Sequence, residues 1–484
     1  MKAFLKRYEK EAALLAGLLV ALVMYFANPF GVDAKAKQVL AIAFLMIVWW
    51  VLDAMPLAVV ALTPLILFPL LNIGTIKETS KSYSDSVIYL FMGGFFLGLA
   101  IEKWNLHKRI ALRIINITGT NGNRIILGFI LATGFLSMWL SNTATTMMMF
   151  PIAASVIQAV TQHAGPKTHV KNFSLTLMLA IAYASNFGGI ATIIGTPPNV
   201  AYISHLKAVN KPAISFSNWM LIFTPLSIVL LFCLYWVMVK WLYPNHITDS
   251  NEGRLYIKTE LKNLGPLSRQ EKRVLVIFCC TASLWIFREI INKQPYFQLD
   301  DTIIALIGAI ALFIVPSGRI KEAPTERLLE WEDTQKMAWG ILLLFGGGIA
   351  LAKALEEAHL IQNMGNFMAS FATDNLLGLI FIVTLLSVFL SEVMSNVAQV
   401  IVMAPVMTAL AVALNINPLL LGIPMTLGAS CAGMLPMGTP PNAIVFSSGH
   451  IQLKQMLRTG FVMNIICVVL ITLFCWLLLP RVLG

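Results

Sequence analysis

Apolar residues recur along this chain in runs long enough to cross a lipid bilayer, separated by polar loops. A membrane-spanning helix requires roughly 17–25 predominantly apolar residues. Runs near this length predict helical spans at residues 12–26, 38–50, 57–73, 87–101, 175–205, 219–239, 274–291, 302–315, 337–355, 418–448 and 461–479. The pattern therefore predicts an all-α polytopic membrane protein with about eleven transmembrane helices.

Two further apolar segments carry polar residues at their centres and predict re-entrant hairpins. Residues 125–159 and 376–411 each contain two apolar arms, which meet at Ser141-Asn142 and at Ser395-Asn396. Each arm is short for a crossing. A hairpin that enters and leaves on one side fits better, and it places its polar tip near the middle of the membrane.

The apolar segment after each hairpin predicts a broken helix. Residues 175–205 and 418–448 both contain the sequence Gly-Thr-Pro-Pro-Asn, beginning at Gly195 and at Gly438. Two consecutive prolines remove two amide donors and interrupt a helix. Non-helical backbone survives at membrane depth only inside protein or beside a water-filled cavity. We therefore expect these breaks to line a polar site.

Three of these features occur twice in the same order, which indicates an internal duplication. The Ser-Asn pairs lie 254 residues apart, and a Gly-Gly pair in Phe91–Leu97 recurs at the same offset in Phe345–Leu351. The two Gly-Thr-Pro-Pro-Asn sequences lie 243 residues apart. The predicted organisation is a first span outside the repeats at 1–37, a first repeat at 38–243, a cytoplasmic connector at 244–273 and a second repeat at 274–484.

The placement of charges predicts that the two repeats are inverted. The amphipathic stretch at residues 103–124 is rich in Lys and Arg, whereas its counterpart at 356–374 contains acids and no Lys or Arg. Basic loops remain on the cytoplasmic side, so the counterparts lie on opposite faces, as in inverted-repeat transporters. The basic N-terminus predicts that the first span begins on the cytoplasmic side. We expect this span to be retained and not cleaved as a signal peptide. An odd number of spans then places the C-terminus outside.

Composition narrows the class of protein. Hydrophobic residues make up 58% and charged residues only 12%, far from the proportions of a soluble domain. The net charge is +11, but the basic residues lie in loops between apolar spans, so the predicted partner is a lipid bilayer and not a nucleic acid. The spans contain no nucleophile–base pair or metal-ligand cluster, so an enzyme is not predicted. We expect a multi-pass protein of the plasma (inner) membrane.

The residue types at the tips and breaks suit a cation together with an anion. Ser and Asn oxygens, with carbonyls freed at Gly195 and Gly438, suit a hard cation such as Na⁺. Amide and hydroxyl donors, with the positive ends of half-helices, suit an anion. The tips and breaks contain no Lys or Arg. A bound anion would therefore need bound cations, which gives a physical reason for coupling the two.

The doubled Ser-Asn tips and Gly-Thr-Pro-Pro-Asn loops resemble the divalent-anion/sodium symporter family, over about residues 12–484. The resemblance implies an elevator-type, usually homodimeric, Na⁺-coupled transporter of dicarboxylates or tricarboxylates, most simply a C4-dicarboxylate such as succinate, fumarate or malate. It implies one Na⁺ site at Ser137, Ser141, Asn142 and Gly195. It implies a second Na⁺ site at Ser391, Asn396 and Gly438. It implies a substrate site at Ser141, Asn142, Thr143, Thr196, Pro197, Ser395, Asn396, Val397, Thr439 and Pro440.

One residue departs from the pattern that this resemblance implies. Val397 stands where the family pattern has Thr, which removes a donor to a substrate carboxylate and makes sulfate a more plausible alternative. Citrate is a further alternative. An anion exchanger of the same family would carry a basic residue near a tip, and the tips contain none. Channels and proton-dependent exporters of the same architecture are the more distant hypotheses.

Several of these residues also have purely structural interpretations. A Ser-Asn pair in one membrane helix commonly serves as packing between helices, and the duplication beside a broken helix is what favours a site. The Gly-Gly pairs at Gly93 and Gly347 are interpreted as close-packing positions. Glu392 has no acidic counterpart, since the matching residue is Met138. It is either a structural hydrogen-bond acceptor or a residue that tunes the second cation site.

Overall fold

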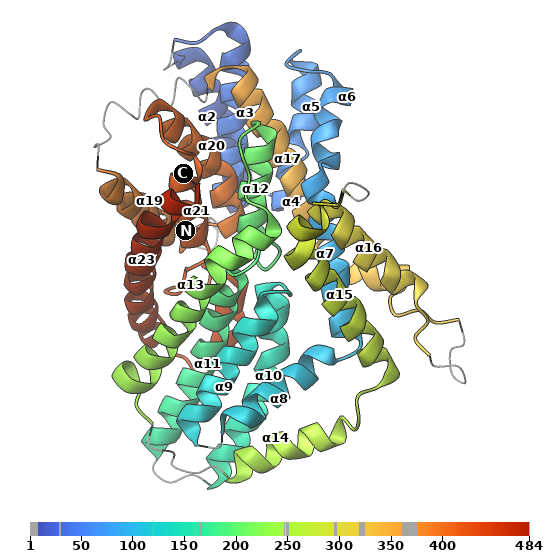
Figure 1. The fold of residues 1–484 in the computed structure, drawn as a ribbon. Coiled ribbons are helices and arrows are strands. Elements are labelled where there is room, and N and C mark those ends of the chain that lie inside the picture. The colour runs from blue at the N-terminus through green and yellow to red at the C-terminus, as the bar shows by residue number, and fades with distance from the viewer. Residues whose placement is uncertain are drawn as a thin grey trace.

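The computed structural model describes residues 8–28, 31–119, 121–163, 167–245, 247, 251–294, 298–318, 325–360 and 375–483. Figure 1 shows a molecule built from helices. In the first half they are α2 (Glu9–Ala27), α3 (Ala34–Val51), α4 (Leu57–Val60), α5 (Thr63–Leu70), α6 (Ile76–Lys81), η1 (Ser82–Ser84), α7 (Ser86–Lys103), α8 (Leu106–Thr118), α9 (Gly122–Ser137), α10 (Asn142–His163), α11 (Lys167–Gly189), α12 (Pro197–Ala208), α13 (Phe216–Trp236) and η2 (Val237–Leu242).

The second half follows a similar order. Its helices are α14 (Asn251–Asn263), α15 (Arg269–Ile291), α16 (Asp301–Ile314), η3 (Trp331–Lys336), α17 (Trp339–Glu357), α19 (Leu376–Leu390), α20 (Asn396–Ala413), α21 (Leu419–Ala429), α22 (Pro440–Phe446) and α23 (Leu453–Leu483). Within the described residues, nine helices are long and apolar enough to cross a membrane. The predicted all-helical membrane class is confirmed.

Each predicted hairpin consists of two helices joined at its Ser-Asn tip. Helix α9 ends at Ser137 and α10 begins at Asn142, while α19 ends at Leu390 and α20 begins at Asn396. In Figure 1, α9 and α10 lie in the lower half of the molecule and α20 lies in the upper half. The two hairpins therefore reach the centre of the molecule from opposite ends.

Both hairpins start with the same cap. The side chain of Asn121 accepts a hydrogen bond from Arg124 N at 2.8 Å, and that of Asn375 accepts one from Gly378 N at 3.3 Å. An Asn cap satisfies an amide that the first helical turn leaves without a partner. The two caps lie 254 residues apart, the same offset as the Ser-Asn tips. The duplication thus extends to the start of each hairpin.

Both helices that follow the hairpins are broken at the predicted Pro-Pro sequences. Helix α11 ends before the break and α12 begins at Pro197, while α21 ends before the second break and α22 begins at Pro440. Proline suits this position because the first amide of a helix has no intrahelical partner. The structure therefore confirms that Gly195 and Gly438 lie in non-helical backbone between two half-helices.

One predicted span differs from the structure. Residues 57–73 were expected to form one span, but they form two short helices, α4 and α5, which are separated at Ala61 and Leu62. Pro64 lacks the amide that would bond to Val60 in a continuous helix. Leu65 N donates to the Leu62 carbonyl and not to that of Ala61, and the Ala61 carbonyl accepts a hydrogen bond from the Tyr83 hydroxyl. The apolar pattern predicted one continuous helix here, whereas the break between α4 and α5 involves Pro64 and the distant Tyr83.

The Gly-Gly pairs join the two halves of the chain by close packing. A Cβ on Gly93 of α7 would lie 2.8 Å from the Ala305 carbonyl oxygen in α16, and a Cβ on Gly347 of α17 would overlap the Ala61 carbonyl oxygen. Only glycine permits backbones to approach this closely. Each half thus supports the Gly-Gly helix of the other, and the packing interpretation of these glycines is confirmed.

The polar segment between the halves contains an amphipathic helix, α14, which lies along the lower end of the molecule in Figure 1. Two ion pairs attach this region to α8. Lys108 pairs with Glu260 at 2.7 Å, and the buried Arg109 pairs with Glu271 at 2.7 Å and also donates to the Gly265 carbonyl at 2.8 Å. The acidic counterpart of the α8 stretch, at 356–374, lies largely outside the described residues.

Candidate functional site

At the first tip, the side chain of Asn142 lies within a group of oxygen atoms. One of its terminal amide atoms lies 2.8 Å from Ser137 Oγ, 3.1 Å from the Ser185 carbonyl oxygen and 3.3 Å from the Gly195 carbonyl oxygen. Ser137 is fully buried and Asn142 is 9% exposed. The structure therefore brings together three of the four residues of the first predicted cation site, and it adds Ser185.

This group of atoms fits a cation. With the Asn142 nitrogen directed at these oxygens, the amide is their donor. With the amide oxygen directed at them, four oxygens lie close together and the Ser137 hydroxyl donates to the amide oxygen. The heavy-atom positions are the same in both orientations. In the second orientation the carbonyl oxygens of Ser185 and Gly195 lie beside the amide oxygen with no donor between them, and a cation among them would offset their repulsion. Hydroxyl, amide and carbonyl oxygens are the donors that a hard cation prefers, so these residues would hold Na⁺.

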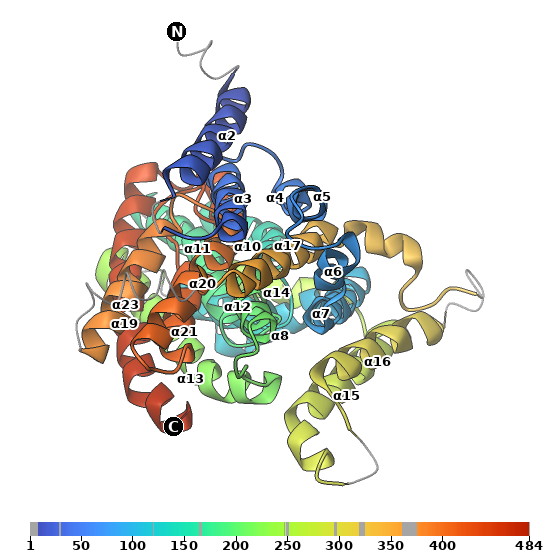
Figure 2. The same ribbon diagram turned by 90° about the horizontal axis from the view of Figure 1, so that it is seen from above.

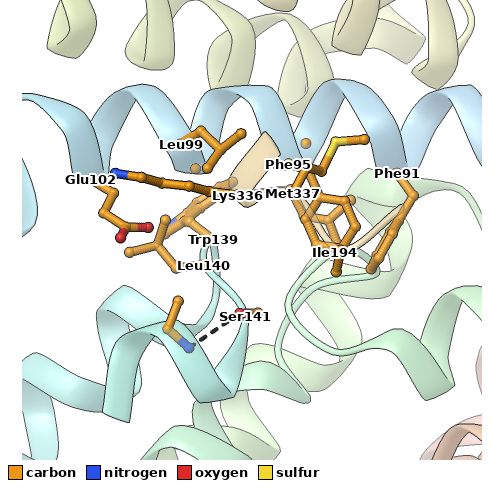
Figure 3. Close-up of a pocket in the computed structure, with 14 residues that line it drawn as sticks. Phe91, Phe95, Leu99, Glu102, Trp139, Leu140, Ser141, Ile194, Lys336 and Met337 are labelled. Atoms are coloured by element: carbon orange, nitrogen blue, oxygen red, sulfur yellow. Dashed lines mark hydrogen bonds between the residues drawn. The ribbon is translucent and has the colours of Figure 1, made fainter. Parts of the chain in front are cut away.

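The fourth predicted residue of this site, Ser141, faces a different direction. Its Oγ accepts a hydrogen bond from Ala144 N at 3.3 Å, as Figure 3 shows. Ser141 lines a cavity of about 100 Å³ between the first tip and α7. In this structure, Ser141 is therefore available to a molecule in that cavity, and it does not join the oxygens around Asn142.

The cavity beside Ser141 is mostly apolar, with charge at one end. Figure 3 shows Phe91, Phe95 and Leu99 of α7 along one wall, and Lys336 near Glu102 at one end. Lys336 belongs to η3, in the second half of the chain, and is exposed. Sequence reasoning found no basic residue near a tip, and it missed Lys336 because this residue lies 195 positions away along the chain. The structure thus adds a positively charged side chain, that of Lys336, beside the first tip.

A buried asparagine, Asn186 on α11, links the first tip to the second break. Its amide oxygen accepts from Asn142 Nδ2 at 3.4 Å, and its amide nitrogen donates to Thr439 Oγ1 at 3.4 Å. Thr196 Oγ1 also accepts from Asn142 Nδ2, at 3.5 Å. These are long bonds, but they place residues of both halves in one polar network. The sequence contained a signal for Asn186, since Ser185-Asn186 is a third Ser-Asn pair in an apolar run.

The two helix breaks are held by matching asparagines. Asn199 Nδ2 donates to the carbonyls of Gly189 at 3.3 Å and Thr192 at 2.9 Å. Asn442 Nδ2 donates to the carbonyls of Ala432 at 3.2 Å and Leu435 at 3.1 Å. In each break the two acceptors lie ten and seven residues before the asparagine. The asparagine that ends each Gly-Thr-Pro-Pro-Asn motif thus stabilises its break through two hydrogen bonds to backbone carbonyls.

The second tip is less connected than the first. Ser391 is buried and its hydroxyl donates to the Val388 carbonyl at 2.9 Å. Asn396 Oδ1 is buried and has no hydrogen-bond partner among the described residues. The contacts described for this tip do not join Ser391, Asn396 and Gly438 to one another. Of the second predicted cation site, the described residues therefore show one buried acceptor without a partner, Asn396 Oδ1, and a serine hydroxyl bonded within its own helix.

The second tip instead has a buried carboxylate. Glu392 is 4% exposed, and its Oε1 accepts from Gly433 N at 2.8 Å, Met434 N at 2.9 Å and Asn464 Nδ2 at 2.7 Å. Its Oε2 accepts from Leu435 N at 3.0 Å. Glu392 thus lies inside the second helix break, in contact with three consecutive amides.

The other predicted substrate residues lie at the starts of the half-helices. Thr143 and Val397 are half-buried in the first turns of α10 and α20, and Ser395 precedes α20. Thr439 caps α22 by accepting from Asn442 N at 3.3 Å. Pro197 and Pro440 begin α12 and α22. Four half-helices therefore start at the positions predicted for the substrate.

Taken together, these features define the class of protein. A bundle of apolar spans that contains two hairpins, two broken helices and a buried polar network from the first tip to the second break is the arrangement of a secondary transporter. Hydroxyls, amides and freed carbonyls bind and release ions at such a site without covalent chemistry.

The chain belongs to the sodium:sulfate symporter family. The family model described as "Sodium:sulfate symporter transmembrane region" matches residues 8–482. Two similar relatives are the sodium-dependent dicarboxylate transporters SdcS of Staphylococcus saprophyticus, 40% identical over 97% of this chain and 91% of the relative, and of Staphylococcus aureus, 39% identical with the same coverage. The predicted family resemblance is confirmed, and the protein is a multi-pass membrane transporter and not an enzyme.

Two solved structures share the fold at low sequence identity. The YdaH transporter of Alcanivorax borkumensis aligns with a TM-score of 0.58 and 13% identity, over 80% of this chain and 84% of that chain. MtrF of Neisseria gonorrhoeae aligns with a TM-score of 0.55 and 12% identity, over 83% of each chain. These likenesses concern the fold alone.

Proposed function

We propose that this protein is a Na⁺-coupled symporter that imports a divalent anion, most simply a C4-dicarboxylate such as succinate, fumarate or malate. The observation that carries the proposal is the group of oxygens around Asn142 at the first tip. The similarity to relatives named sodium-dependent dicarboxylate transporters supports the choice of substrate. At least two Na⁺ ions are proposed, one at each tip.

The substrate is proposed to bind between the two tips, where four half-helices begin. The starts of α10 and α20 offer amide donors and a partial positive charge, whereas α12 and α22 each begin with two prolines and offer only the partial positive charge. The residues proposed to contact the anion are those predicted from the sequence, including Ser141, Thr143, Thr439 and Pro440. Bound Na⁺ ions would offset the anion's charge, so substrate affinity depends on Na⁺. This dependence is what couples uptake to the Na⁺ gradient.

The proposed movement is of the elevator type, in which the tips and broken helices carry substrate past a fixed scaffold. The two glycines of each Gly-Gly pair have different neighbours, which supports a division into a fixed scaffold and a moving part. Gly93 and Gly347 face backbone of the other half, which suits a rigid scaffold. Gly94 and Gly348 instead face the side chains of Ile194 and Ile401, in the first break and in α20. Contact through methyl groups permits sliding without breaking hydrogen bonds.

We further propose a homodimer in the plasma membrane, with the N-terminus cytoplasmic and the C-terminus outside. The basic residues around α8 and the connector support a cytoplasmic position for that end of the molecule. Exposed apolar residues on α2 suit contact with lipid or with a second copy. Examples are Leu15, Leu19 and Phe26.

The test is uptake of labelled succinate by proteoliposomes, with Na⁺ or K⁺ outside and with unlabelled fumarate, citrate and sulfate as competitors. We expect accumulation that requires Na⁺, saturates with succinate and is blocked by fumarate. Uptake of sulfate or citrate in place of succinate would retain the coupling and reject the dicarboxylate. Equal flux in K⁺, or flux that does not saturate, would reject symport and favour an exchanger or a channel.

The movement has a separate test. A Gly98→Cys/Leu140→Cys pair in a cysteine-free background joins α7 to the first tip, because a Cβ on Gly98 would lie 3.1 Å from Leu140 Cδ2. We expect cross-linking to stop uptake and a reductant to restore it. The control pair, Ala58→Cys/Gly340→Cys, lies within the proposed scaffold at 3.2 Å between Cβ positions, near disulfide geometry. Uptake that survives the first cross-link would argue against the elevator.

A further inference from the structure

Helix α11 carries a third Ser-Asn pair, Ser185-Asn186, in addition to the pairs at the two tips. Asn186 is 1% exposed, and its amide lies between the first tip and the second break. Oδ1 accepts from Asn142 Nδ2 at 3.4 Å. Nδ2 donates to Thr439 Oγ1 at 3.4 Å and to the Ala432 carbonyl at 3.5 Å. One amide therefore contacts a predicted cation ligand in the first half and a predicted substrate residue in the second.

The attachment of α11 to the second break does not depend on the Asn186 amide alone. One turn earlier on the same helix, the buried Tyr183 hydroxyl donates to the Gly433 carbonyl at 2.7 Å. That bond is short, whereas the three bonds of the Asn186 amide are longer than most hydrogen bonds in proteins. An amide held by long bonds can exchange its donor and acceptor ends when a neighbour changes from donor to acceptor.

The neighbour that can change in this way is Asn142. When a cation lies among the oxygens at the first tip, the Asn142 oxygen faces it, and Nδ2 donates to Asn186. Without a cation, the Asn142 nitrogen satisfies these oxygens by turning toward them. The Asn142 oxygen then lies opposite the Asn186 oxygen. Two buried amide oxygens in contact repel each other, so the Asn186 amide reverses as well and becomes the donor.

The reversal of Asn186 changes what the Thr439 hydroxyl can do. In the orientation that accompanies a cation, Thr439 Oγ1 accepts from Asn186 Nδ2 at 3.4 Å and from Asn442 N at 3.3 Å. A hydroxyl has two acceptor lone pairs and one hydrogen, so its hydrogen is left for another acceptor, such as a carboxylate. When Asn186 reverses, its oxygen faces Thr439 and accepts that hydrogen. Thr439 then has no donor to offer an anion.

We propose that Asn186 is a positioning residue that relays the occupancy of the first cation site to the substrate site, by setting the direction in which the Thr439 hydroxyl donates. With Na⁺ at the first tip, the hydroxyl donates to the anion; without Na⁺, it donates to Asn186. This inference rests on the proposed symport and deepens it. Attraction between Na⁺ and the anion requires no particular side chain between them, whereas the relay depends on one neutral amide.

The test measures how strongly Na⁺ changes succinate binding to the purified full-length protein. The succinate concentration for half-maximal thermal stabilisation is measured at low and at saturating Na⁺, with choline keeping the ionic strength constant. The ratio of the two values is the coupling factor. Asn186→Leu keeps a similar volume and has no hydrogen-bonding group. We expect it to lower the coupling factor about five-fold, the contribution of one hydrogen bond.

The matched control is Thr176→Val on the same helix. It removes a buried hydroxyl that has no hydrogen-bond partner among the described residues, and it should leave the coupling factor unchanged. A merely structural role for Asn186 gives a different result from a relay. Damage to the site weakens succinate binding equally at both Na⁺ concentrations, which leaves the factor unchanged and would overturn the proposal. Loss of the relay frees the Thr439 hydroxyl at low Na⁺, so succinate binding there should tighten relative to binding at saturating Na⁺.

Variants of Thr439 test the other end of the relay. Thr439→Val should also lower the coupling factor about five-fold, because the hydroxyl contributes to succinate binding only at saturating Na⁺. Thr439→Ser keeps the hydroxyl and should keep the factor. Combining Asn186→Leu with Thr439→Val should lower the factor no further, since both changes remove the same contribution. Effects that multiply to about 25-fold would show that the two residues act independently, against the relay.

Failure of the relay can be distinguished from failure of the proposed function. Where Asn186→Leu does not fold, Thr439→Val decides: succinate binding that weakens equally at low and at saturating Na⁺ overturns the relay. A wild-type protein in which Na⁺ leaves succinate binding unchanged rejects the proposed symport itself. A wild-type protein with a normal coupling factor that Asn186→Leu does not change rejects the relay alone.

Discussion

The two hairpin tips occupy matching positions 254 residues apart, but their polar groups are satisfied in different ways. At the first tip, Asn142 lies among Ser137, Ser185 and Gly195, and the hydroxyl of Thr192 donates to the Met138 carbonyl. At the second tip, Glu392 stands at the position of Met138, and its carboxylate accepts from the amides of the break. A neutral contact in one half is replaced by a charged contact in the other.

This difference shows what a duplicated site preserves and what it changes. The asparagines that tie the breaks bind carbonyls at the same two spacings in both halves. The backbone frame is therefore common to the two tips, while the side chains that fill it differ. If a cation binds at each tip, as proposed, the two cations have different electrostatic surroundings.

The largest expected effect comes from removing the tip asparagines. Asn142→Ala and Asn396→Ala should each lower Na⁺-dependent succinate uptake about 100-fold, since loss of about 3 kcal/mol of ion binding has this consequence. They should differ in stability without Na⁺. Asn142 makes hydrogen bonds in the structure and Asn396 Oδ1 makes none that is described, so only the first variant lowers the thermal midpoint. Normal uptake in both variants would reject the site.

The second prediction tests the part that both halves share. Asn199→Ala and Asn442→Ala each remove two hydrogen bonds to backbone carbonyls. At about 1 kcal/mol for each bond, both should destabilise the protein by about 2 kcal/mol. Thermal unfolding of the detergent-solubilised protein measures this loss. Equal losses would confirm a common frame, whereas a loss confined to one variant would show that the two breaks are held differently.

The third prediction concerns the cation beside the first tip. Lys336 lines the cavity that Ser141 also lines, at the end where Glu102 lies. Removing the lysine leaves the Glu102 carboxylate there, which repels a dianion. Lys336→Gln should raise the KM for succinate about three- to ten-fold, most at low ionic strength. The Na⁺ dependence should stay the same. Lys77→Gln, an exposed lysine on α6, is the matched control. A KM that matches the control would exclude Lys336 from the substrate path.

The smallest effect is expected at Val397. Val397→Thr restores the hydroxyl that the family pattern has in the second tip, with little change in side-chain size. One added neutral hydrogen bond is worth about 0.5–1.5 kcal/mol, so the KM for succinate should fall about two- to ten-fold. Competition by sulfate, measured in the same uptake assay, should weaken in parallel. An unchanged KM and unchanged competition would mean that Val397 faces away from the substrate.

Much of this architecture could be predicted because it depends on local chemistry. Apolar runs indicate segments that lie within the membrane, consecutive prolines indicate helix breaks, and matched spacing indicates duplication. The break at Ala61 was missed because apolar content alone does not reveal that Pro64 has no amide hydrogen to donate or that the Tyr83 hydroxyl donates to the Ala61 carbonyl. The exact number of crossings stays a prediction, since a hairpin arm such as α10 is as long and apolar as a true span.

The sequence by itself determined the class of this protein, its doubled tips and breaks, and the residue types available to a cation and an anion. Only the tertiary structure decided which groups meet. It brought Ser185 and Asn186 to the first tip, Lys336 to the cavity beside it, and Glu392 to the amides of residues 433–435. The physical reason is range: helix formation and helix breaking depend on neighbours a few residues apart, whereas these contacts join residues from 41 to 195 positions apart.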